Sequence, residues 1–230
     1  MSATAFVLAA GLGTRLRPYT LATPKPLLPV DGRPMLDHVV GWLRAAGHTR
    51  IVVNAHWLSE QVVAWAEAQP GVEVVVEQPR ILGTGGGLRN ARDLLAERFV
   101  VANGDILSDV DLSALWAVEA PAVMALRPQE RPVHTPVMLR DGVVTGIGQV
   151  VGEPDGRHHF TGIHVLHRSL LDLIPPGEQC VVRTVYRSLV ARGVVRGVVH
   201  PGQWTDIGTV AEYEAVRDRR QPFVGGVGEF

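Results

Sequence analysis

The chain has 230 residues, of which 46% are hydrophobic and 20% charged, and its formal net charge is −1. This length and composition allow one sizeable core and predict a single domain over residues 1–230. The near-zero charge excludes a long-range positive field that would draw the protein to nucleic acid or to an anionic membrane. We therefore expect no nucleic-acid partner and no membrane partner, and a monomer or small homo-oligomer.

The cysteine content and the N-terminus indicate a compartment. The single Cys180 excludes a disulfide framework and a zinc site built from cysteines. The N-terminal stretch MSATAFVLAAGLG has no basic region ahead of its short apolar run. No stretch of the chain approaches the roughly 20 apolar residues that span a bilayer. These features predict a cytoplasmic protein.

Short apolar runs alternate with amphipathic segments in the first half of the chain. The runs TAFVLAA, RIVVNA, VEVVVE and RFVVANGD are typical of buried strands, and helical patterns follow the second and third of them. In the segment RPMLDHVVGWLRAAGH, Met35, Val39 and Leu43 share one face, and Gly47 is placed to end the helix. This alternation predicts an α/β fold.

The C-terminal half has a different pattern. Residues 121–166 are rich in strand-forming residues punctuated by Pro and Gly, which predicts extra β strands, with the pair His158 and His159 at a solvated strand edge. Thr209 and Glu212 have the spacing of a capping box at the start of a last helix. Residues 221–230 lack periodicity and predict a loose tail.

The first predicted strand runs directly into the loop AAGLGTRLRP. Its small residues and the glycines Gly11 and Gly13 let the backbone approach a ligand and point N–H groups at it, as phosphate-binding loops do. The spacing matches neither G-x-x-x-x-G-K-[ST] nor G-x-G-x-x-G, and a tight turn without a ligand is the alternative. Arg15 favours the phosphate interpretation, because a guanidinium presents a fork of donors to phosphate oxygens.

Lys25 is the only lysine among 22 basic residues. Pro24 and Pro26 restrict the backbone on both sides of it and Pro29 follows, so we expect a stiff, extended segment that aims the ammonium. A compact point charge fits among several oxygens of one phosphate, where a planar guanidinium imposes its own geometry. A surface lysine retained by chance is the alternative.

Two aspartates are candidate metal ligands. Asp105 follows a predicted strand, and ligands of open α/β sheets lie beyond the carboxyl ends of strands. Asp206 precedes the last predicted helix. A pair of carboxylates near phosphates suits Mg²⁺, although either residue taken singly is also explained as a turn or cap residue.

The stretch VLAAGLGTRLRPYTLATPKPLLPV, with ANGD and WTDIGT, resembles the sugar-1-phosphate nucleotidyltransferases. The match recurs in order through NAHWLSEQV, LGTGGGLRNA and FTGIHVL and covers nearly the whole chain. It implies a Rossmann-like mixed, mainly parallel sheet flanked by helices and a Mg²⁺ ion. The implied reaction converts a nucleoside triphosphate and a sugar 1-phosphate to a nucleotide sugar and pyrophosphate.

The resemblance also implies residue roles. Arg15 would contact the β- and γ-phosphates, Lys25 the reacting phosphates, and Asp105 with Asp206 the metal. The other positions that it implies are Ala9, Ala10, Gly11, Gly13, Thr14, Gln78, Gly83, Thr84 and Gly85 for the nucleotide, and Asn103, Thr161 and Gly162 for the sugar.

The substrates are predicted from finer features. The chain resembles most the small N-acetylmuramate-1-phosphate uridylyltransferases, with mannose- or heptose-1-phosphate guanylyltransferases as the alternative. Gln78 is expected to face the base and favours UTP, because an amide offers one donor and one acceptor to uracil, but Glu77 would replace it if the register slips by one. Many relatives carry a second lysine in an E-K-P stretch, whereas GEPDG at 152–156 has none, so Arg157 or the metal is expected to hold the sugar phosphate.

Two other classes use related loops. A nucleotide-binding regulator without turnover would have no need of Lys25 and both aspartates. A dehydrogenase would require a third glycine in the loop and an acidic residue at the end of the second strand, where Asn54 and His56 stand instead.

Overall fold

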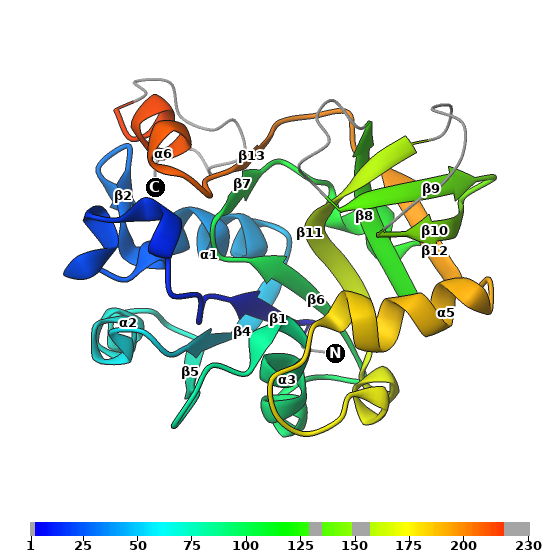
Figure 1. Cartoon of the computed structure of the whole chain (residues 1–230), viewed down its shortest axis with the longest axis horizontal. Helices are drawn as coiled ribbons and strands as arrows, with labels where there is room; N and C mark the ends of the chain where they lie inside the picture. The colour runs from blue at the N-terminus through cyan, green and yellow to red at the C-terminus, as the bar shows by residue number, and fades with distance from the viewer. Residues whose placement is uncertain (1–2, 129–134, 149–156, 219–230) are drawn as a thin grey trace. The chain divides into compact units, whose positions relative to one another are not determined.

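The computed structural model describes residues 3–128, 135–148 and 157–218 (Figure 1). The chain divides into two compact units. Unit 1 comprises Met1–Ile81, Ala102–Asp109 and Gly202–Phe230, and unit 2 comprises Leu82–Val101 and Val110–Pro201. The tail predicted at residues 221–230 lies outside the described residues. The chain passes from unit 2 to unit 1 within strand β6 (Arg98–Asn103), and a single domain stays a prediction.

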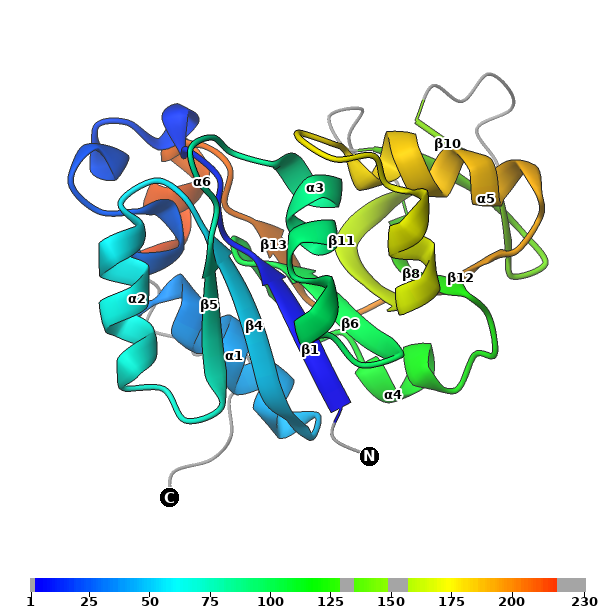
Figure 2. The same cartoon turned by 90° about the horizontal axis from the view of Figure 1, so that it is seen from below.

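Unit 1 is built on three parallel strands, β1 (Ala3–Leu8), β4 (His48–Ala55) and β5 (Val72–Val76), with β4 in the middle. Residues 4–7 of β1 and 51–55 of β4 are buried, which explains why these stretches are mostly continuous apolar runs rather than alternating ones. Helix α1 (Met35–Ala45) packs on β4, and α2 (Ser59–Glu67) packs along β5 (Figure 2). The strands and helices predicted here are confirmed to within a few residues.

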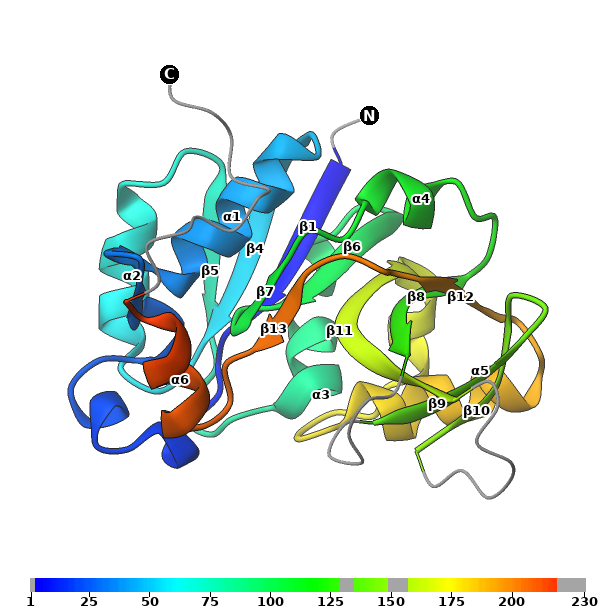
Figure 3. The same ribbon diagram turned by 90° about the horizontal axis from the view of Figure 1, so that it is seen from above.

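The rest of unit 1 consists of short elements. They are η1 (Thr14–Leu16), η2 (Tyr19–Leu21), η3 (Lys25–Leu27), β2 (Pro29–Val30), β3 (Arg33–Pro34), β7 (Ile106–Ser108), β13 (Trp204–Asp206) and α6 (Val210–Val216). Strands β7 and β13 pair in antiparallel fashion, and α6 follows β13 (Figure 3). Thr209 is confirmed as the N-cap of α6, since its hydroxyl accepts from the Glu212 N–H at 3.3 Å. The Glu212 carboxylate accepts from the Gly208 N–H at 3.0 Å, one residue before the N–H that a standard capping box uses.

Unit 2 is a mixed sheet in which antiparallel pairs prevail. Its strands follow the spatial order β6, β11 (Arg157–His167), β8 (Ala122–Pro128), β12 (Val195–Val199), β10 (Val143–Ile147) and β9 (Pro136–Arg140). Of these, β12 and β8 run parallel. The predicted α/β fold with a mixed sheet and extra C-terminal strands is confirmed. The mainly parallel character that the resemblance implied holds for β1, β4 and β5, whereas the pairings described in unit 2 are antiparallel except that of β12 with β8.

The pair His158 and His159 was wrongly predicted to lie at a solvated edge. Strand β11 is paired on both sides at this point, with β8 and with β9, and His159 is buried. The prediction failed because the strand that covers it, β9, lies about 20 residues upstream and pairs there only in the tertiary structure.

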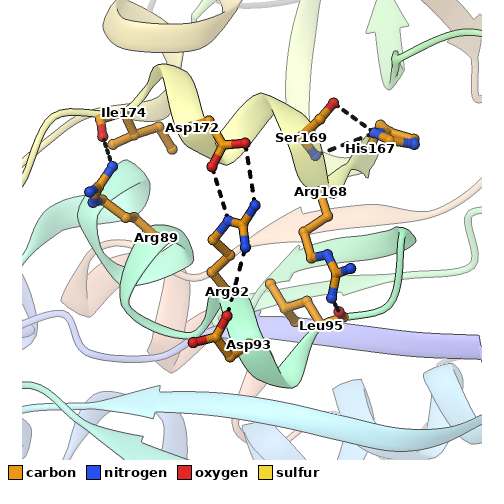
Figure 4. A network of polar contacts seen from close by, with 9 residues as sticks. All are labelled: Arg89, Arg92, Asp93, Leu95, His167, Arg168, Ser169, Asp172 and Ile174. Carbon is orange, nitrogen blue, oxygen red and sulfur yellow. Dashed lines mark hydrogen bonds and ion pairs between the residues drawn. The ribbon is translucent and has the colours of Figure 1, made fainter.

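The helical elements of unit 2 are α3 (Gly83–Asn90), η4 (Arg92–Leu94), α4 (Leu112–Trp116), η5 (Arg168–Leu173), the π-helix η6 (Val182–Tyr186) and α5 (Arg187–Ala191). Arginines tie the end of α3 and the residues after it to η5 (Figure 4). The Arg92 guanidinium binds both carboxylate oxygens of Asp172, at 3.0 and 3.3 Å, and Arg89 donates to the Ile174 carbonyl at 2.6 Å. Among the described residues, no helix has the length and apolar character needed to cross a membrane.

Helix α3 contains four glycines, and its packing explains one of them directly. A Cβ on Gly86 would lie 2.2 Å from the Gly177 carbonyl oxygen, so the two backbones can approach this closely only if residue 86 has no side chain.

We predict opposite effects for the same substitution in two helices. Alanine normally stabilises a helix interior relative to glycine by about 1 kcal/mol. Gly86→Ala should nevertheless lower the free energy of unfolding, by more than about 1 kcal/mol, because the new methyl meets a backbone oxygen. Gly41→Ala, in α1, should raise it, since nothing lies within 4 Å of the added Cβ. Urea unfolding measures both, and a stabilised Gly86→Ala variant would contradict the packing argument.

Candidate active site

The loop after β1 is held in place by contacts at both ends. Ala9 and Ala10 are buried, and the Ala9 N–H donates to the Asn54 carboxamide oxygen at 2.7 Å. Gly13 has a positive φ of 62°, and a Cβ on it would lie 2.8 Å from the Thr20 methyl. Gly11, by contrast, faces open space, with nothing within 4 Å of an added Cβ. The loop is therefore a fixed backbone turn with an accessible glycine, as the phosphate-cradle interpretation requires.

Arg15 lies beside the segment that carries Asp206. Thr14 and Arg15 open η1, and the Arg15 guanidinium lies 3.0 to 3.3 Å from where a Cβ on Gly208 would be. The arginine side chain thus covers the bare backbone two residues after Asp206. Any side chain at position 208 would displace the guanidinium.

Lys25 forms an ion pair with Asp105. The Lys25 side chain is 11% exposed and that of Asp105 is 28% exposed, so both charges are partly removed from water. The Lys25 Cβ lies 3.1 Å from the ideal Cβ position of Gly13, which places the aliphatic part of the lysine side chain against the loop after β1. An arrangement of this kind holds an ammonium and a carboxylate next to exposed backbone.

The backbone at Lys25 differs from the prediction. Pro24 is extended, with φ −63° and ψ 143°, but Lys25–Leu27 is a turn of 3₁₀-helix rather than a continuation of an extended segment. Pro26 is compatible with this turn, because proline in the first helical turn forfeits no intrahelical hydrogen bond. The prolines do restrict the chain as expected, but they restrict it to a bend.

Asp105 and Asp206 are neighbours in the structure although they are far apart in the sequence. Asp206 pairs with Ile106 across β13 and β7, and the Ile207 N–H donates to the Asp105 carbonyl at 3.1 Å. Among the described residues, no group of three or more Asp, Glu, His or Cys side chains forms a metal site. Two carboxylates nevertheless fit Mg²⁺, which takes one or two protein carboxylates and completes its shell with water and substrate phosphates.

A small apolar cluster lies behind these residues and was not predicted. It joins the lysine loop, the strands that follow Asp105 and precede Ile207, and the last helix. Its buried members are Leu16, Leu28, Val30, Met35, Leu107, Ile207, Tyr213 and Val216. Tyr213 also donates its hydroxyl to the Pro29 carbonyl at 3.0 Å and packs edge-on against Tyr19. The one sequence signal for this role is Tyr213, the single aromatic residue of α6.

Glu77 and Gln78, the two residues predicted as alternatives for contact with the nucleotide base, differ in burial. Glu77 is 1% exposed; its carboxylate accepts from the Asn54 amide at 2.7 Å, and its N–H donates to the Ala55 carbonyl at 2.8 Å. Gln78 is exposed. The carboxylate of Glu77 is therefore committed to the interior of unit 1, whereas the Gln78 amide is accessible to a ligand.

Gly83, Thr84 and Gly85 begin α3 in unit 2 and contact the loop at residues 177–181. A Cβ on Gly83 would lie 2.6 Å from the Gln179 carbonyl oxygen, to which the Gly85 N–H donates at 2.8 Å. The Thr84 hydroxyl accepts from the Val181 N–H at 3.0 Å. These glycines thus allow a close backbone approach within unit 2, and their contact with a base stays a prediction.

A protein-family model described as the MobA-like NTP transferase domain matches residues 5–194. The chain belongs to this family. The N-acetylmuramate alpha-1-phosphate uridylyltransferase of Neisseria meningitidis is 34% identical to it, over 90% of this chain and 93% of that protein. The mannose-1-phosphate guanylyltransferase of Mycobacterium tuberculosis is also 34% identical, over 91% of this chain but only 62% of the longer relative. Among solved structures, HddC from Yersinia pseudotuberculosis shares the fold, with a TM-score of 0.80, 21% identity and coverage of 94% of this chain and 98% of that one.

In this NTP transferase the residues predicted to bind the sugar occupy different units. Asn103 is half-buried at the end of β6, and Thr161 and Gly162 belong to β11. Thr161 is fully buried, and its hydroxyl donates to the Ala125 carbonyl at 2.8 Å and accepts from the Ile163 N–H at 3.3 Å. Its side chain therefore shapes the strand, and a contact with sugar stays a prediction.

Strand β11 is irregular where Thr161 and Gly162 lie. The pairing with β8 shifts register between Phe160 and His164, and Gly162 has a φ of 80°. Such bulges re-aim the residues next to them and are frequent beside binding sites. The segment at 152–156, where a second lysine was sought, lies outside the described residues, and Arg157 is half-buried at the start of β11.

A buried polar pair lies under this bulge. His164 Nδ1 and the Tyr186 hydroxyl form a hydrogen bond of 2.5 Å, and Tyr186 ends the π-helix. Burial lowers the pKa of His164 to about 3 and raises the pKa of Tyr186. Both groups are therefore neutral at neutral pH, and the imidazole serves as a hydrogen-bonding element.

We predict that His164 makes the protein sensitive to acid. Its pKa is about 3 in the folded state against 6.5 for the free side chain, so folding disfavours the protonated form. Its contribution to stability is complete above pH 6.5 and falls as the pH decreases toward 3, by about 2 kcal/mol at pH 5. His164→Asn retains an acceptor near Tyr186 without a titrating group. Urea unfolding at pH 7 and pH 5 should show a smaller loss in the variant, and equal losses would contradict the assignment.

Proposed function

We propose that this protein is a Mg²⁺-dependent sugar-1-phosphate nucleotidyltransferase, with UTP and N-acetylmuramate 1-phosphate as its substrates. The observation that carries the proposal is the convergence of Arg15, Lys25, Asp105 and the backbone of Asp206 at one place in unit 1. Relatives with uridylyltransferase and guanylyltransferase activities support the reaction class. A nucleoside triphosphate substrate favours the cytoplasmic location predicted from the sequence.

The chemistry requires positioning and charge neutralisation rather than a base. An oxygen of the sugar phosphate forms a bond to the α-phosphorus of the nucleotide, and the bond from that phosphorus to the bridging oxygen of pyrophosphate breaks. The attacking phosphate is already anionic, so no proton has to be removed from it. Lys25 supplies a point charge for the reacting phosphates, and Arg15 a fork of donors for the departing pyrophosphate.

The ion pair of Lys25 with Asp105 suits this role. It holds a largely buried ammonium in place before the substrates bind, since an unpaired charge at this depth would be costly. Asp105 and Asp206 would hold the Mg²⁺ ion, which supplies electrostatic stabilisation of the charge on the transferring phosphates.

The principal alternative is a guanylyltransferase acting on mannose or heptose 1-phosphate. The burial of Glu77 argues against it, because a carboxylate is the better acceptor for the adjacent N1–H and N2–H₂ donors of guanine and this one already binds Asn54. The accessible Gln78 amide offers a donor and an acceptor, which match uracil. A regulator that binds nucleotide without turnover would produce no pyrophosphate.

We predict that Gln78→Glu changes base preference. The parent protein, assayed for pyrophosphate release with UTP or GTP and a panel of sugar 1-phosphates, should have the highest kcat/KM with UTP and N-acetylmuramate 1-phosphate. The Gln78→Glu variant should lower the ratio of kcat/KM for UTP to that for GTP, because polar mismatches in such pockets discriminate strongly. A parent that prefers GTP, or a ratio that does not move, would remove Gln78 from base recognition. Preference for mannose or heptose 1-phosphate would select the alternative, and no release with any pair would favour the regulator.

We predict that Lys25→Arg abolishes most of the activity although it conserves charge. Loss of one preorganised contact at the transition state typically costs about 10²–10³ in rate. The melting temperature should change little. The matched control is Arg50→Lys, which exchanges the same two side chains in a surface pair with Glu73 and should retain activity. A Lys25→Arg variant that turns over like the parent would refute the requirement for an ammonium.

We predict that Asp105→Asn and Asp206→Asn each weaken metal binding while the protein stays folded, although Asp105→Asn should also lower its stability because it leaves the Lys25 ammonium without its partner. Each substitution removes one of two negative charges offered to the ion. Mn²⁺ binding followed by electron paramagnetic resonance, with nucleotide present, should weaken in both variants, and the Mg²⁺ concentration for half-maximal rate should rise. Unchanged metal titrations would leave both residues with turn and cap roles.

A further inference from the structure

Residues 54–61 run from the end of β4 to the start of α2 and contact three segments of unit 1 near the candidate site, namely the loop after β1, residues 20–22 and Glu77. We call residues 54–61 the framing segment. Side chains from four of its positions form hydrogen bonds to backbone atoms outside it. The bonds join Asn54 Oδ1 to the Ala9 N–H at 2.7 Å, His56 Nδ1 to the Glu77 carbonyl at 2.8 Å, Trp57 Nε1 to the Thr20 carbonyl at 2.9 Å and Gln61 Nε2 to the Ala22 carbonyl at 2.8 Å.

Trp57 is connected to the reacting centre through Thr20. The Trp57 indole N–H donates to the Thr20 carbonyl, and the Thr20 hydroxyl donates to the Gly13 carbonyl at 2.7 Å. The Thr20 methyl also fills the space beside Gly13, and the Lys25 stem packs on the same glycine. Displacement of Thr20 would therefore shift both the loop after β1 and the Lys25 side chain.

The surroundings of Trp57 indicate that its role depends on the hydrogen bond of the indole N–H more than on apolar packing. The side chain is one of the more exposed large apolar residues of the described chain, at 36%. The next residue, Leu58, has a φ of 50°, which is unusual for a bulky side chain and persists only where neighbouring contacts hold the backbone. Such a rigid turn directs the indole to one carbonyl.

We propose that the framing segment positions the nucleotide-binding loops, and that Trp57 is a positioning residue that sets Gly13 and Lys25 through Thr20. This assignment rests on the proposed function for its effect on the nucleotide, but the effect on the loop does not depend on the reaction. It gives a role to the stretch NAHWLSEQ, which supplies no reacting group.

The test compares two tryptophans of unit 1. Trp57→Phe retains an aromatic ring and removes the N–H. The control Trp65→Phe makes the same change in α2, where the indole donates to the Asp37 carboxylate at 2.7 Å, away from the loops. Thr20→Val removes the central hydroxyl and keeps a similar shape.

Two readouts separate positioning from general stability. In Trp57→Phe and Thr20→Val, amide hydrogen exchange without ligand should accelerate in peptides covering residues 9–28, and the KM for the nucleotide should rise about 3- to 10-fold, as expected for one lost hydrogen bond. The KM for the sugar 1-phosphate should stay within about twofold of the parent. Trp65→Phe should leave the exchange of these peptides and both KM values unchanged, even where its melting temperature falls equally.

The double variant tests the connection itself. If Trp57 acts through Thr20, the rise in nucleotide KM of the double variant should be well below the product of the two single effects, whereas independent sites would multiply. Unchanged exchange in residues 9–28, faster exchange without a change in nucleotide KM, or multiplying effects would each overturn the proposal. A parent protein with no turnover on any substrate pair would overturn the proposed function, and the exchange comparison would still decide whether the segment holds the loop.

Discussion

The ion pair between Lys25 and Asp105 is the contact on which the arrangement of the candidate site depends. A lysine that is 11% exposed requires an opposite charge within reach, and the two residues come from segments far apart in the chain. The pair forms because Lys25 turns back in a 3₁₀-helix and because the Gly104 N–H donates to the Leu8 carbonyl at 2.8 Å, which holds the turn before Asp105 against the end of β1. A packed apolar cluster behind them then fixes β7, β13 and α6.

Close backbone approaches are the second constraint, and they explain why several glycines stand where helix propensity disfavours them. Helix α3 is rich in glycine and would be a poor helix in isolation, since each glycine costs about 1 kcal/mol relative to alanine. Its packing against residues 177–181 requires bare backbone, and packing outweighs propensity here. Gly208 likewise allows a close approach, in this case of a side chain, because the Arg15 guanidinium occupies the space that a Cβ would fill.

These constraints match the demands of nucleotidyl transfer. A reaction whose nucleophile is already charged depends on how accurately cations and donors are placed, so residues that hold loops matter as much as residues that touch phosphate. The bonds from residues 54–61 and from Tyr213 reach backbone atoms rather than substrates, and they restrict the loops that carry Gly13 and Lys25. In unit 2, a hydrogen bond between the side chains of His164 and Tyr186 joins an irregular strand to the π-helix.

The sequence by itself determined the features that depend on neighbouring residues. Strand and helix order, the cap of α6 by Thr209 and the unusual character of Lys25 follow from local pattern, composition and side-chain chemistry. Only the tertiary structure decided which carboxylate pairs with Lys25, that Glu77 is buried while Gln78 is exposed, and that β9 covers His159. The structure also shows a 3₁₀ turn at Lys25–Leu27, where the sequence predicted an extended segment. The physical reason is that these outcomes arise from pairing and packing between segments remote in the chain, where loop closure and burial, rather than local preference, set the free energy.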